Sequence, residues 1–279
     1  MTKKAILARE VSSMMDGLGP VEITGAAIHQ FRPAKIFVGF SGGFDSLVTT
    51  HWMMNNIRGC EVFHANTGIG IERTREFVRH TCDWFGWPLT EIRAKEDCGQ
   101  DYDEMVIAHG FPGPGHHYKM FQRLKERCVR KLVAMNKTKV SDCVMIATGI
   151  RKDESARRAG YKYSVIDHVG SAMWVNPFYY RSREWFSAYI KKYQLPQNPV
   201  SKLLGMSGEC LCGAYAHSGE LALVKMVCPA THDRIRALEA RVRDAGHAWG
   251  WEEKPPKKVA ASTGKFMPFC VGCEKEDRA

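Results

Sequence analysis

The chain has 279 residues, of which 44% are hydrophobic and 25% charged, the balance of an ordinary folded protein with a sizeable core. No run approaches the ~18 apolar residues that cross a membrane, and no apolar stretch follows the basic amino terminus, so we expect no membrane partner and a cytoplasmic location. The formal net charge of +10 suits a polyanionic partner, a need that nucleotide phosphates or a nucleic acid would meet.

The apolar pattern predicts helices and strands that alternate along most of the chain. The first 35 residues are expected to form a helical lead-in, broken at Gly17-Leu-Gly-Pro20. The elements predicted next are strand 36–40, helix 45–57, strand 60–65, helix 72–85, strand 88–93, helices 101–109 and 117–136, and strand 142–148. Strands separated by helices of this length predict βαβ units, and therefore a Rossmann-like α/β fold with a mainly parallel sheet.

The last third of the chain is predicted to be more irregular. A helix is expected over 182–193 and a longer one over 230–245, with an irregular segment over 197–215 between them. Residues 252–265, rich in Lys, Pro, Ala and Ser, are typical of a linker. We therefore predict an α/β domain over residues 1–200 and a cysteine-bearing region over residues 201–279.

The motif Ser-Gly-Gly-Phe-Asp-Ser joins the strand 36–40 to the helix that follows it. Its glycines let the backbone approach a ligand closely, and the first N–H groups of the helix favour an anion. Two serine hydroxyls add donors. The predicted phosphate-binding residues are Ser41, Gly42, Gly43, Phe44, Asp45 and Ser46. A plain turn followed by a capped helix is the alternative interpretation.

Two other motifs follow strands of the predicted sheet. Asn66, Thr67 and Gly68 end the second strand, and the stretch 148–158 follows the strand 142–148. Ligands of parallel sheets bind beyond these carboxyl ends, so we expect both motifs beside the phosphate loop. The second stretch supplies Gly149 and the cations Arg151, Lys152, Arg157 and Arg158. Arginine forks suit phosphate oxygens, although an exposed, charged helix start would have the same composition.

These three motifs, in this order, resemble those of the phosphoadenosine-phosphosulfate reductase superfamily of PP-loop proteins over about residues 35–200. The first resembles the PP-loop of N-type ATP pyrophosphatases, and the second resembles the strand end that contacts adenosine. The segment from Asn176-Pro-Phe to Ile190 is also similar. The chain lacks the Glu-Cys-Gly-Leu-His tail of the thioredoxin-dependent reductases, whereas it keeps the complete Ser-Gly-Gly-x-Asp-Ser loop that those reductases usually lack.

The resemblance implies an enzyme that binds ATP, cleaves it between the α and β phosphates, and activates a substrate for sulfur transfer. Residues 41–46 would hold the β and γ phosphates, and Mg²⁺ would lie near Asp45. Arg151, Arg157 or Arg158 would stabilise negative charge at the α-phosphate. A sulfur donor protein would be a further partner. The alternatives are a reductase of adenylylsulfate or phosphoadenylylsulfate, and a nucleic-acid-binding component of a modification complex.

The ten cysteines do not suggest a disulfide framework, because no secretion signal precedes them. Cys60, Cys82, Cys98 and Cys143 are isolated in or beside apolar segments and are expected to pack in the core. The pair Cys210 and Cys212 and the pair Cys270 and Cys273 have spacings that let two thiolates converge on one metal.

Cys128 begins a Cys-Val-Arg-Lys stretch that resembles the first cysteine motif of the iron–sulfur branch of the superfamily. That branch includes assimilatory adenylylsulfate reductases and DNA phosphorothioation ATPases. The resemblance implies an iron–sulfur cluster on Cys128 and the pair at 210 and 212, with Cys228 or the tail pair as the fourth ligand. The two closely spaced pairs would also make a Zn²⁺ site, and spacing does not choose between the two.

The segment 119–139 carries eight Lys and Arg residues against the single acid Glu126. Such a run forms either a solvated helix face or a surface for nucleic acid. Both interpretations stay open from the sequence.

Overall fold

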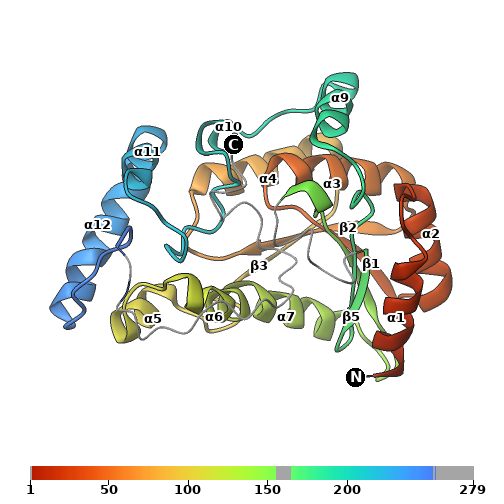
Figure 1. The fold of residues 1–279 in the computed structure, drawn as a ribbon, viewed down its shortest axis with the longest axis horizontal. Helices are drawn as coiled ribbons and strands as arrows, with labels where there is room; N and C mark the ends of the chain where they lie inside the picture. The colour runs from red at the N-terminus through yellow and green to blue at the C-terminus, as the bar shows by residue number, and fades with distance from the viewer. Residues whose placement is uncertain (1, 155–164, 254, 256–279) are drawn as a thin grey trace.

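The computed structural model describes residues 2–154, 165–253 and 255, and in them a six-stranded sheet lies between two layers of helices (Figure 1). The strands are β1 Lys35–Gly39, β2 Cys60–Asn66, β3 Leu89–Arg93, β4 Val144–Ala147, β5 Ile166–Val169 and β6 Ala172–Val175. Their order is β3-β2-β1-β4-β6-β5, and every neighbouring pair is parallel except β5 with β6. The α/β fold with a mainly parallel sheet is therefore confirmed.

Helices cover both faces of the sheet. They are α1 Lys3–Ser13, α2 Pro20–Phe31, α3 Phe44–Asn56, α4 Glu72–Phe85, α5 Tyr102–His109, α6 His117–Phe121, α7 Arg127–Met135, α9 Arg183–Tyr193, α10 Pro199–Leu204, α11 Glu220–Val227 and α12 Pro229–Asp244. Shorter turns are η1 Pro114–His116, η2 Gln122–Glu126 and η3 Lys152–Glu154. In Figure 1, α3, α4 and α9 lie above the sheet, α5, α6 and α7 lie below it, and α11 and α12 lie at one end.

Side chains of the central strands alternate between two apolar clusters, as the period of two in a strand requires. Phe37 of β1 and Phe63 of β2 belong to the cluster that includes α7, α11 and α12. Val38 and Val62, the neighbouring residues, belong to the cluster that includes α2, α3 and α9. Because both faces of these strands are buried, they read in the sequence as short continuous apolar runs.

The structure adds elements that the sequence did not predict. The hairpin of β5 and β6 consists of strands of four residues joined at Gly170, whose φ is +63°, and runs this short show no clear alternation. Helix α10 lies inside the segment 197–215 that was expected to be irregular, so that prediction was wrong there. Asn198 caps α10 by accepting from the Val200 N–H, and Pro199 occupies its first turn.

The region beyond residue 200 shares the first apolar cluster with the sheet. Leu221, Leu238 and Trp251 pack in the same cluster as Phe37 of β1. Most of the predicted linker 252–265 lies outside the described residues. Within the described ranges, no helix has the length and apolar character needed to cross a membrane.

Candidate functional site

The loop between β1 and α3 has the geometry of an anion cradle. Gly43 is the N-cap of α3, and no side chain caps this helix end. Gly42 has φ +75°, and a Cβ on it would lie 2.8 Å from Cγ2 of Thr74, so a larger residue does not fit. The Ser41 and Ser46 hydroxyls lie 3.1 Å apart, and the Ser46 hydroxyl also donates to the Gly43 carbonyl at 2.9 Å. Backbone donors and two hydroxyls thus meet at the carboxyl edge of the sheet.

The Asp45 carboxylate forms a buried, two-point ion pair with Arg151. Arg151 Nε lies 3.1 Å from Oδ1, and Nη2 lies 3.3 Å from Oδ2. Their exposed fractions are 9% for Asp45 and 3% for Arg151. The two predicted catalytic residues therefore contact each other, although 106 positions separate them in the chain. Neighbouring strands bring them together, because β1 and β4 are parallel partners.

The end of β4 contacts the start of α3 through their backbones. A Cβ on Gly149 would lie 2.8 Å from both the carbonyl carbon and the carbonyl oxygen of Asp45. The same Cβ would lie 3.0 Å from the backbone nitrogen of Ser46. Gly149 is therefore required for this close approach, and its contact with the nucleotide stays a prediction.

The polar groups of Asn66 and Thr67 are used inside the protein. Asn66 Nδ2 donates to Glu91 at 2.6 Å, and its Oδ1 accepts from the Gly68 N–H at 3.0 Å. The Thr67 N–H donates to Glu209 Oε1 at 2.9 Å, and the Thr67 hydroxyl donates to the Glu209 carbonyl at 2.6 Å. These strand-end residues thus hold a segment of the C-terminal region, and adenosine contact by them stays a prediction.

Glu209 is the buried anchor of that segment, with an exposed fraction of 2%. Its Oε2 lies 3.4 Å from His64 Nε2 and 3.3 Å from Arg75 Nε, which are ion-pair distances. Burial disfavours ionisation of Glu209, but His64, Arg75 and the Thr67 N–H outweigh it and hold the pKa of the carboxyl below its usual value. For His64, burial is likewise outweighed by Glu209, so its pKa is raised.

The sequence did not predict that Asn198 would contact the phosphate loop. Asn198 Nδ2 donates to the Gly42 carbonyl at 3.0 Å and to the Thr74 hydroxyl at 3.1 Å. Thr74 donates in turn to the Ser207 carbonyl at 2.7 Å. In the sequence, Asn198 followed by Pro199 indicates the start of a helix. It does not indicate that Asn198 contacts the phosphate loop.

The described cysteines do not gather into a metal centre. In the ranges that the structure describes, no group of three or more His, Cys, Asp and Glu side chains could hold a metal ion. Cys128 is fully buried in α7, where its thiol donates to the Leu124 carbonyl at 3.4 Å and hydrogen-bonds with Cys98. Burial raises the pKa of both thiols.

The other predicted ligands have contacts of their own or fall outside the described residues. Cys210 is half-buried and Cys212 is buried, and the Cys212 carbonyl accepts from the Tyr102 hydroxyl at 2.9 Å. Cys228 precedes α12, where it accepts from the Thr231 hydroxyl at 3.1 Å. The predicted site residues outside the described ranges are Cys270, Cys273, Arg157 and Arg158.

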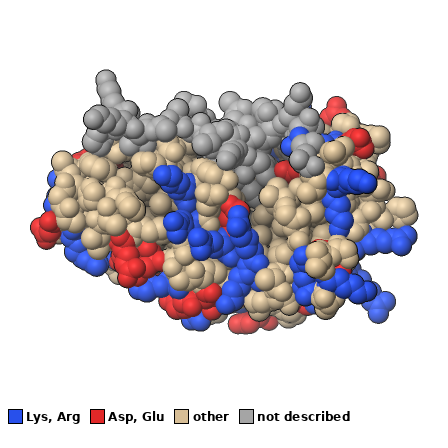
Figure 2. All heavy atoms as spheres, turned by 90° about the horizontal axis from the view of Figure 1, so that it is seen from below, with Lys and Arg blue, Asp and Glu red and all other residues tan. Residues whose placement is uncertain are grey.

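The basic segment 119–139 forms one face of the molecule. It comprises α6, η2 and α7, which follow one another without a break from His117 to Met135, much as the predicted helix 117–136. Figure 2 shows Lys and Arg side chains across the middle of this face. The exposed cations of the segment are Lys119, Arg123, Arg127, Arg130, Lys131 and Lys139, whereas Lys125 is buried.

A protein-family model and a known reductase match this chain in sequence. The model of the phosphoadenosine phosphosulfate reductase domain matches residues 35–203, more than half of the chain. An adenosine 5′-phosphosulfate reductase of Burkholderia cepacia is 22% identical over 170 residues, which span 61% of this chain and 65% of that protein. The chain thus aligns with less than two thirds of that relative.

Solved structures resemble the fold. The phosphoadenylyl-sulfate (PAPS) reductase from Candida auris, in a phosphate complex, has a TM-score of 0.52 and 16% identity, covering 73% of this chain and 92% of that chain. An NH₃-dependent NAD synthetase from Campylobacter jejuni, in complex with the nitrate ion, covers 90% of this chain and 97% of its own. Its TM-score is 0.46, at 14% identity.

Proposed function

The chain belongs to the phosphoadenosine phosphosulfate reductase domain family, and from this premise we propose that it is an enzyme that cleaves ATP between the α and β phosphates. The products are pyrophosphate and an adenylylated substrate, activated for sulfur transfer. The superfamily resemblance carried by the sequence motifs is confirmed by the family match over residues 35–203. The branch of the superfamily stays a prediction.

The observation that carries the proposal is the intact phosphate loop at the carboxyl edge of the sheet. The start of α3 has Gly43 as its N-cap and no side-chain cap, and Ser41 and Ser46 stand beside it. A helix start of this kind favours phosphate oxygens through its N–H groups and its dipole. Residues 41–46 would bind the β and γ phosphates, and the α-phosphate would then lie toward the end of β4.

In the proposed reaction, an oxygen of the acceptor attacks the α-phosphorus and forms a new P–O bond. The bond from that phosphorus to the α,β-bridging oxygen breaks, and its electron pair leaves on pyrophosphate. The acceptor proton passes to solvent or to the departing pyrophosphate. Arg151, beside the start of α3, would stabilise the charge that develops around the phosphorus. A sulfur nucleophile on a donor would later displace AMP from the activated acceptor.

Arg151 hydrogen-bonds to both oxygens of the Asp45 carboxylate, and each oxygen keeps a further lone pair that a magnesium ion would use. A magnesium ion near Asp45 therefore stays a proposal. Mg²⁺ would neutralise charge on the triphosphate when it accompanies ATP. The work of this chain's own residues is to hold the phosphates and to keep Arg151 at the site.

An iron–sulfur cluster, with Zn²⁺ as its alternative, also stays a proposal. The described thiols alone do not build its site, so the fit depends on residues beyond them, with Cys270 and Cys273 as candidates. Iron and acid-labile sulfide, measured on anaerobically purified protein, test the cluster. Both contents are expected to fall in Cys210→Ser and Cys212→Ser, and to persist in Cys143→Ser, a core cysteine beside the Phe31 carbonyl.

A second candidate is reduction of adenylylsulfate or phosphoadenylylsulfate, which the match to the Burkholderia cepacia reductase favours. Two assays separate the candidates. ATP cleavage predicts pyrophosphate release from ATP, whereas reduction predicts sulfite from the sulfonucleotide with a thiol reductant and no ATP. Sulfite production without pyrophosphate release would overturn the first proposal. Salt-dependent binding of nucleic acid to the 119–139 face without turnover of either nucleotide would favour the binding-component alternative.

A further inference from the structure

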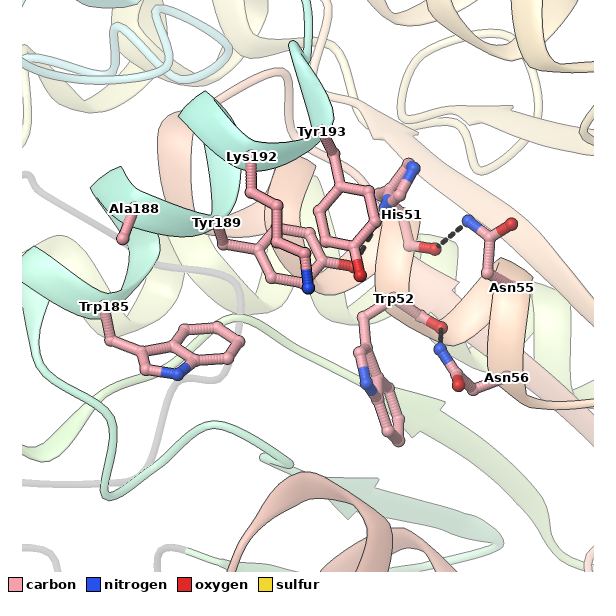
Figure 3. A pocket seen from close by; sticks show the side chains of 9 residues that line it. All are labelled: His51, Trp52, Asn55, Asn56, Trp185, Ala188, Tyr189, Lys192 and Tyr193. Atoms are coloured by element: carbon pink, nitrogen blue, oxygen red, sulfur yellow. Dashed lines mark hydrogen bonds between the residues drawn. The ribbon is translucent and has the colours of Figure 1, made fainter.

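A pocket of about 620 Å³ opens between α3 and α9 (Figure 3). Its wall on α3 is formed by the last two turns of that helix, where His51 and Trp52 are buried and Asn55 and Asn56 are exposed. Its wall on α9 carries three aromatic side chains and Lys192. A volume of this size is that of a typical ligand site and exceeds what one base alone would fill.

The aromatic side chains on α9 form a ladder. Trp185, Tyr189 and Tyr193 recur at intervals of four residues, so they lie on one face of the helix. Neighbouring ring centroids are 5.2 Å and 4.5 Å apart, with interplanar angles of 30° and 41°. Figure 3 shows these rings lined up along the pocket. At these distances the rings pack against one another, and Tyr193, at the end of the series, leaves 45% of its surface exposed to solvent.

The charge of the pocket excludes a cationic ligand. Lys192 is a cation, and none of the nine lining residues is an acid. Burial lowers the pKa of His51, which favours its uncharged ring, and Nδ1 shares a 2.9 Å hydrogen bond with the Tyr189 hydroxyl. An aromatic cage that binds a quaternary ammonium group would not carry a lysine such as Lys192 at its rim, because the two cations would repel each other. The pocket therefore suits a flat, hydrogen-bonding group that carries a negative charge nearby.

Amide groups at the pocket are held in place by the helix itself. Asn55 Nδ2 donates to the His51 carbonyl at 2.7 Å, and Asn56 Nδ2 donates to the Trp52 carbonyl at 2.8 Å. Both bonds tie a side chain to the residue four positions earlier. Fixed polar groups beside stacked rings are the surroundings that a nucleobase prefers, since it needs both a flat contact and hydrogen bonds at its edge.

The pocket and the phosphate loop lie along the same pair of helices. Phe44, the first residue of α3, stacks on Phe186 of α9 at 6.3 Å, and the guanidinium of Arg183 lies 5.5 Å from the Phe44 ring. The two helices therefore start together at the loop, and the pocket lies two to three turns farther along α3. A chain molecule in the pocket would extend toward the phosphate loop and toward Arg183.

We propose that the pocket between α3 and α9 binds a single-stranded nucleic acid, with a base stacked on the exposed Tyr193 ring and a phosphate on Lys192. A single strand fits better than a duplex because its bases are free to stack on protein rings. A pocket larger than one base fits a strand better than one free nucleotide. The net charge of +10 supports the same kind of partner. This site is separate from the basic 119–139 face, which lies on the other side of the sheet (Figure 1).

The test is direct binding of a fluorescein-labelled oligothymidylate of about ten nucleotides, and of the matching oligouridylate, to the full chain at low salt without ATP. Fluorescence anisotropy reports binding, and quenching of tryptophan fluorescence reports stacking near Trp52 and Trp185. Tyr193→Ala and Lys192→Glu are each expected to weaken binding about tenfold, as the loss of one stacking or phosphate contact predicts. Both positions are exposed, so the fold should persist.

Matched controls separate the pocket from general attraction to charge. Lys191→Glu makes the same charge change one position away but outside the pocket lining, and Trp84→Ala removes an aromatic side chain that is 84% exposed on α4. Both are expected to bind within about twofold of the unchanged protein at moderate salt. Equal weakening by Lys191→Glu and Lys192→Glu with no effect of Tyr193→Ala would overturn the inference. Weakening by Arg130→Glu on α7 alone, or no binding of either strand, would overturn it as well.

Discussion

Arg151 holds both oxygens of the Asp45 carboxylate, with Nε 3.1 Å from Oδ1 and Nη2 3.3 Å from Oδ2. The pair joins the end of β4 to the first turn of α3, so it fixes the phosphate loop relative to the neighbouring strand. Arg151 also lies 5.3 Å from the Phe186 ring, which places α9 against the same junction. The position of the phosphate loop therefore depends on Arg151, a residue that lies outside the loop.

Removing one partner of this pair is expected to be costly. Arg151→Ala leaves the buried Asp45 carboxylate uncompensated, and such a loss costs about 3–5 kcal/mol of unfolding free energy. The double variant Asp45→Ala with Arg151→Ala should lose less than the sum of the two single changes, because neither charge is then left alone. Urea unfolding of the three variants measures both effects.

An exposed pair gives the control for that series. Arg130 and Glu126 form an ion pair one helical turn apart, with 72% of the arginine side chain exposed. Arg130→Ala should cost about 0.3–0.5 kcal/mol, as exposed pairs on helices do. If Arg151→Ala were as mild as Arg130→Ala, the buried pair would not be what holds the loop.

Gly149→Ala is expected to disturb the phosphate loop through its backbone. The new Cβ would lie 2.8 Å from the carbonyl of Asp45, and a backbone atom cannot move aside as a side chain can. We expect lower affinity for ATP and slower pyrophosphate release, measured by calorimetry and a pyrophosphate assay. Gly25→Ala is the matched control, since nothing lies within 4 Å of its Cβ and alanine favours helix α2 by about 1 kcal/mol.

The parts of the fold that local patterns determine were predicted from the sequence. The strand before Ser41 and the helix after Gly43 follow from an apolar run, two glycines and helix-compatible residues. Parallel pairing then brings the ends of β1, β2 and β4 to one edge, so the motifs near 41, 66 and 148 lie together as expected. Order along the chain was enough because a parallel sheet aligns the carboxyl ends of its strands.

The contact between Thr67 and Glu209 was not predictable in the same way. These residues are 142 positions apart, and one carboxylate in an irregular segment has no period to mark it. Gly70 is the residue in the sequence that reflects this contact. The Glu209 carbonyl oxygen lies close to where a Cβ on Gly70 would be, so only glycine fits there. In the sequence, however, Gly70 is equally typical of a turn that faces a ligand. The same ambiguity affects Cys128, whose thiol hydrogen-bonds with Cys98, a residue expected only to pack in the core.

The Glu209 cluster predicts a specific dependence of stability on pH. The lowered pKa of Glu209 gives stability that is complete above its ordinary value of 4.5 and is lost as pH falls through the folded-state value. The raised pKa of His64 gives stability that is complete below 6.5 and is lost as pH rises through its folded-state value. The unfolding free energy should therefore be highest between these limits and decline on the alkaline side.

Glu209→Gln is expected to abolish that alkaline decline, because His64 loses the carboxylate that keeps it protonated. Urea midpoints from about pH 5 to about pH 9 measure the effect. Glu72→Gln serves as the control, since Glu72 pairs with Arg75 and Arg79 near the surface and leaves the Glu209 cluster in place. A decline that persists in Glu209→Gln would assign the pH dependence to another group.

Ser41→Ala tests the role of the phosphate loop with little cost in stability. Ser41 is half-buried, and among described residues its hydroxyl hydrogen-bonds with the Ser46 hydroxyl, so its loss should change the urea midpoint slightly. If it donates to a charged phosphate oxygen, that bond is worth about 1.5–3 kcal/mol, and pyrophosphate release from ATP should fall about tenfold to a hundredfold. Ser187→Ala removes an equally small hydroxyl that bonds the Arg183 carbonyl on α9, and should leave the rate unchanged. Equal rates of pyrophosphate release in the two variants would contradict ATP binding by the loop. That result would not bear on the pocket between α3 and α9, which the anisotropy assay tests separately.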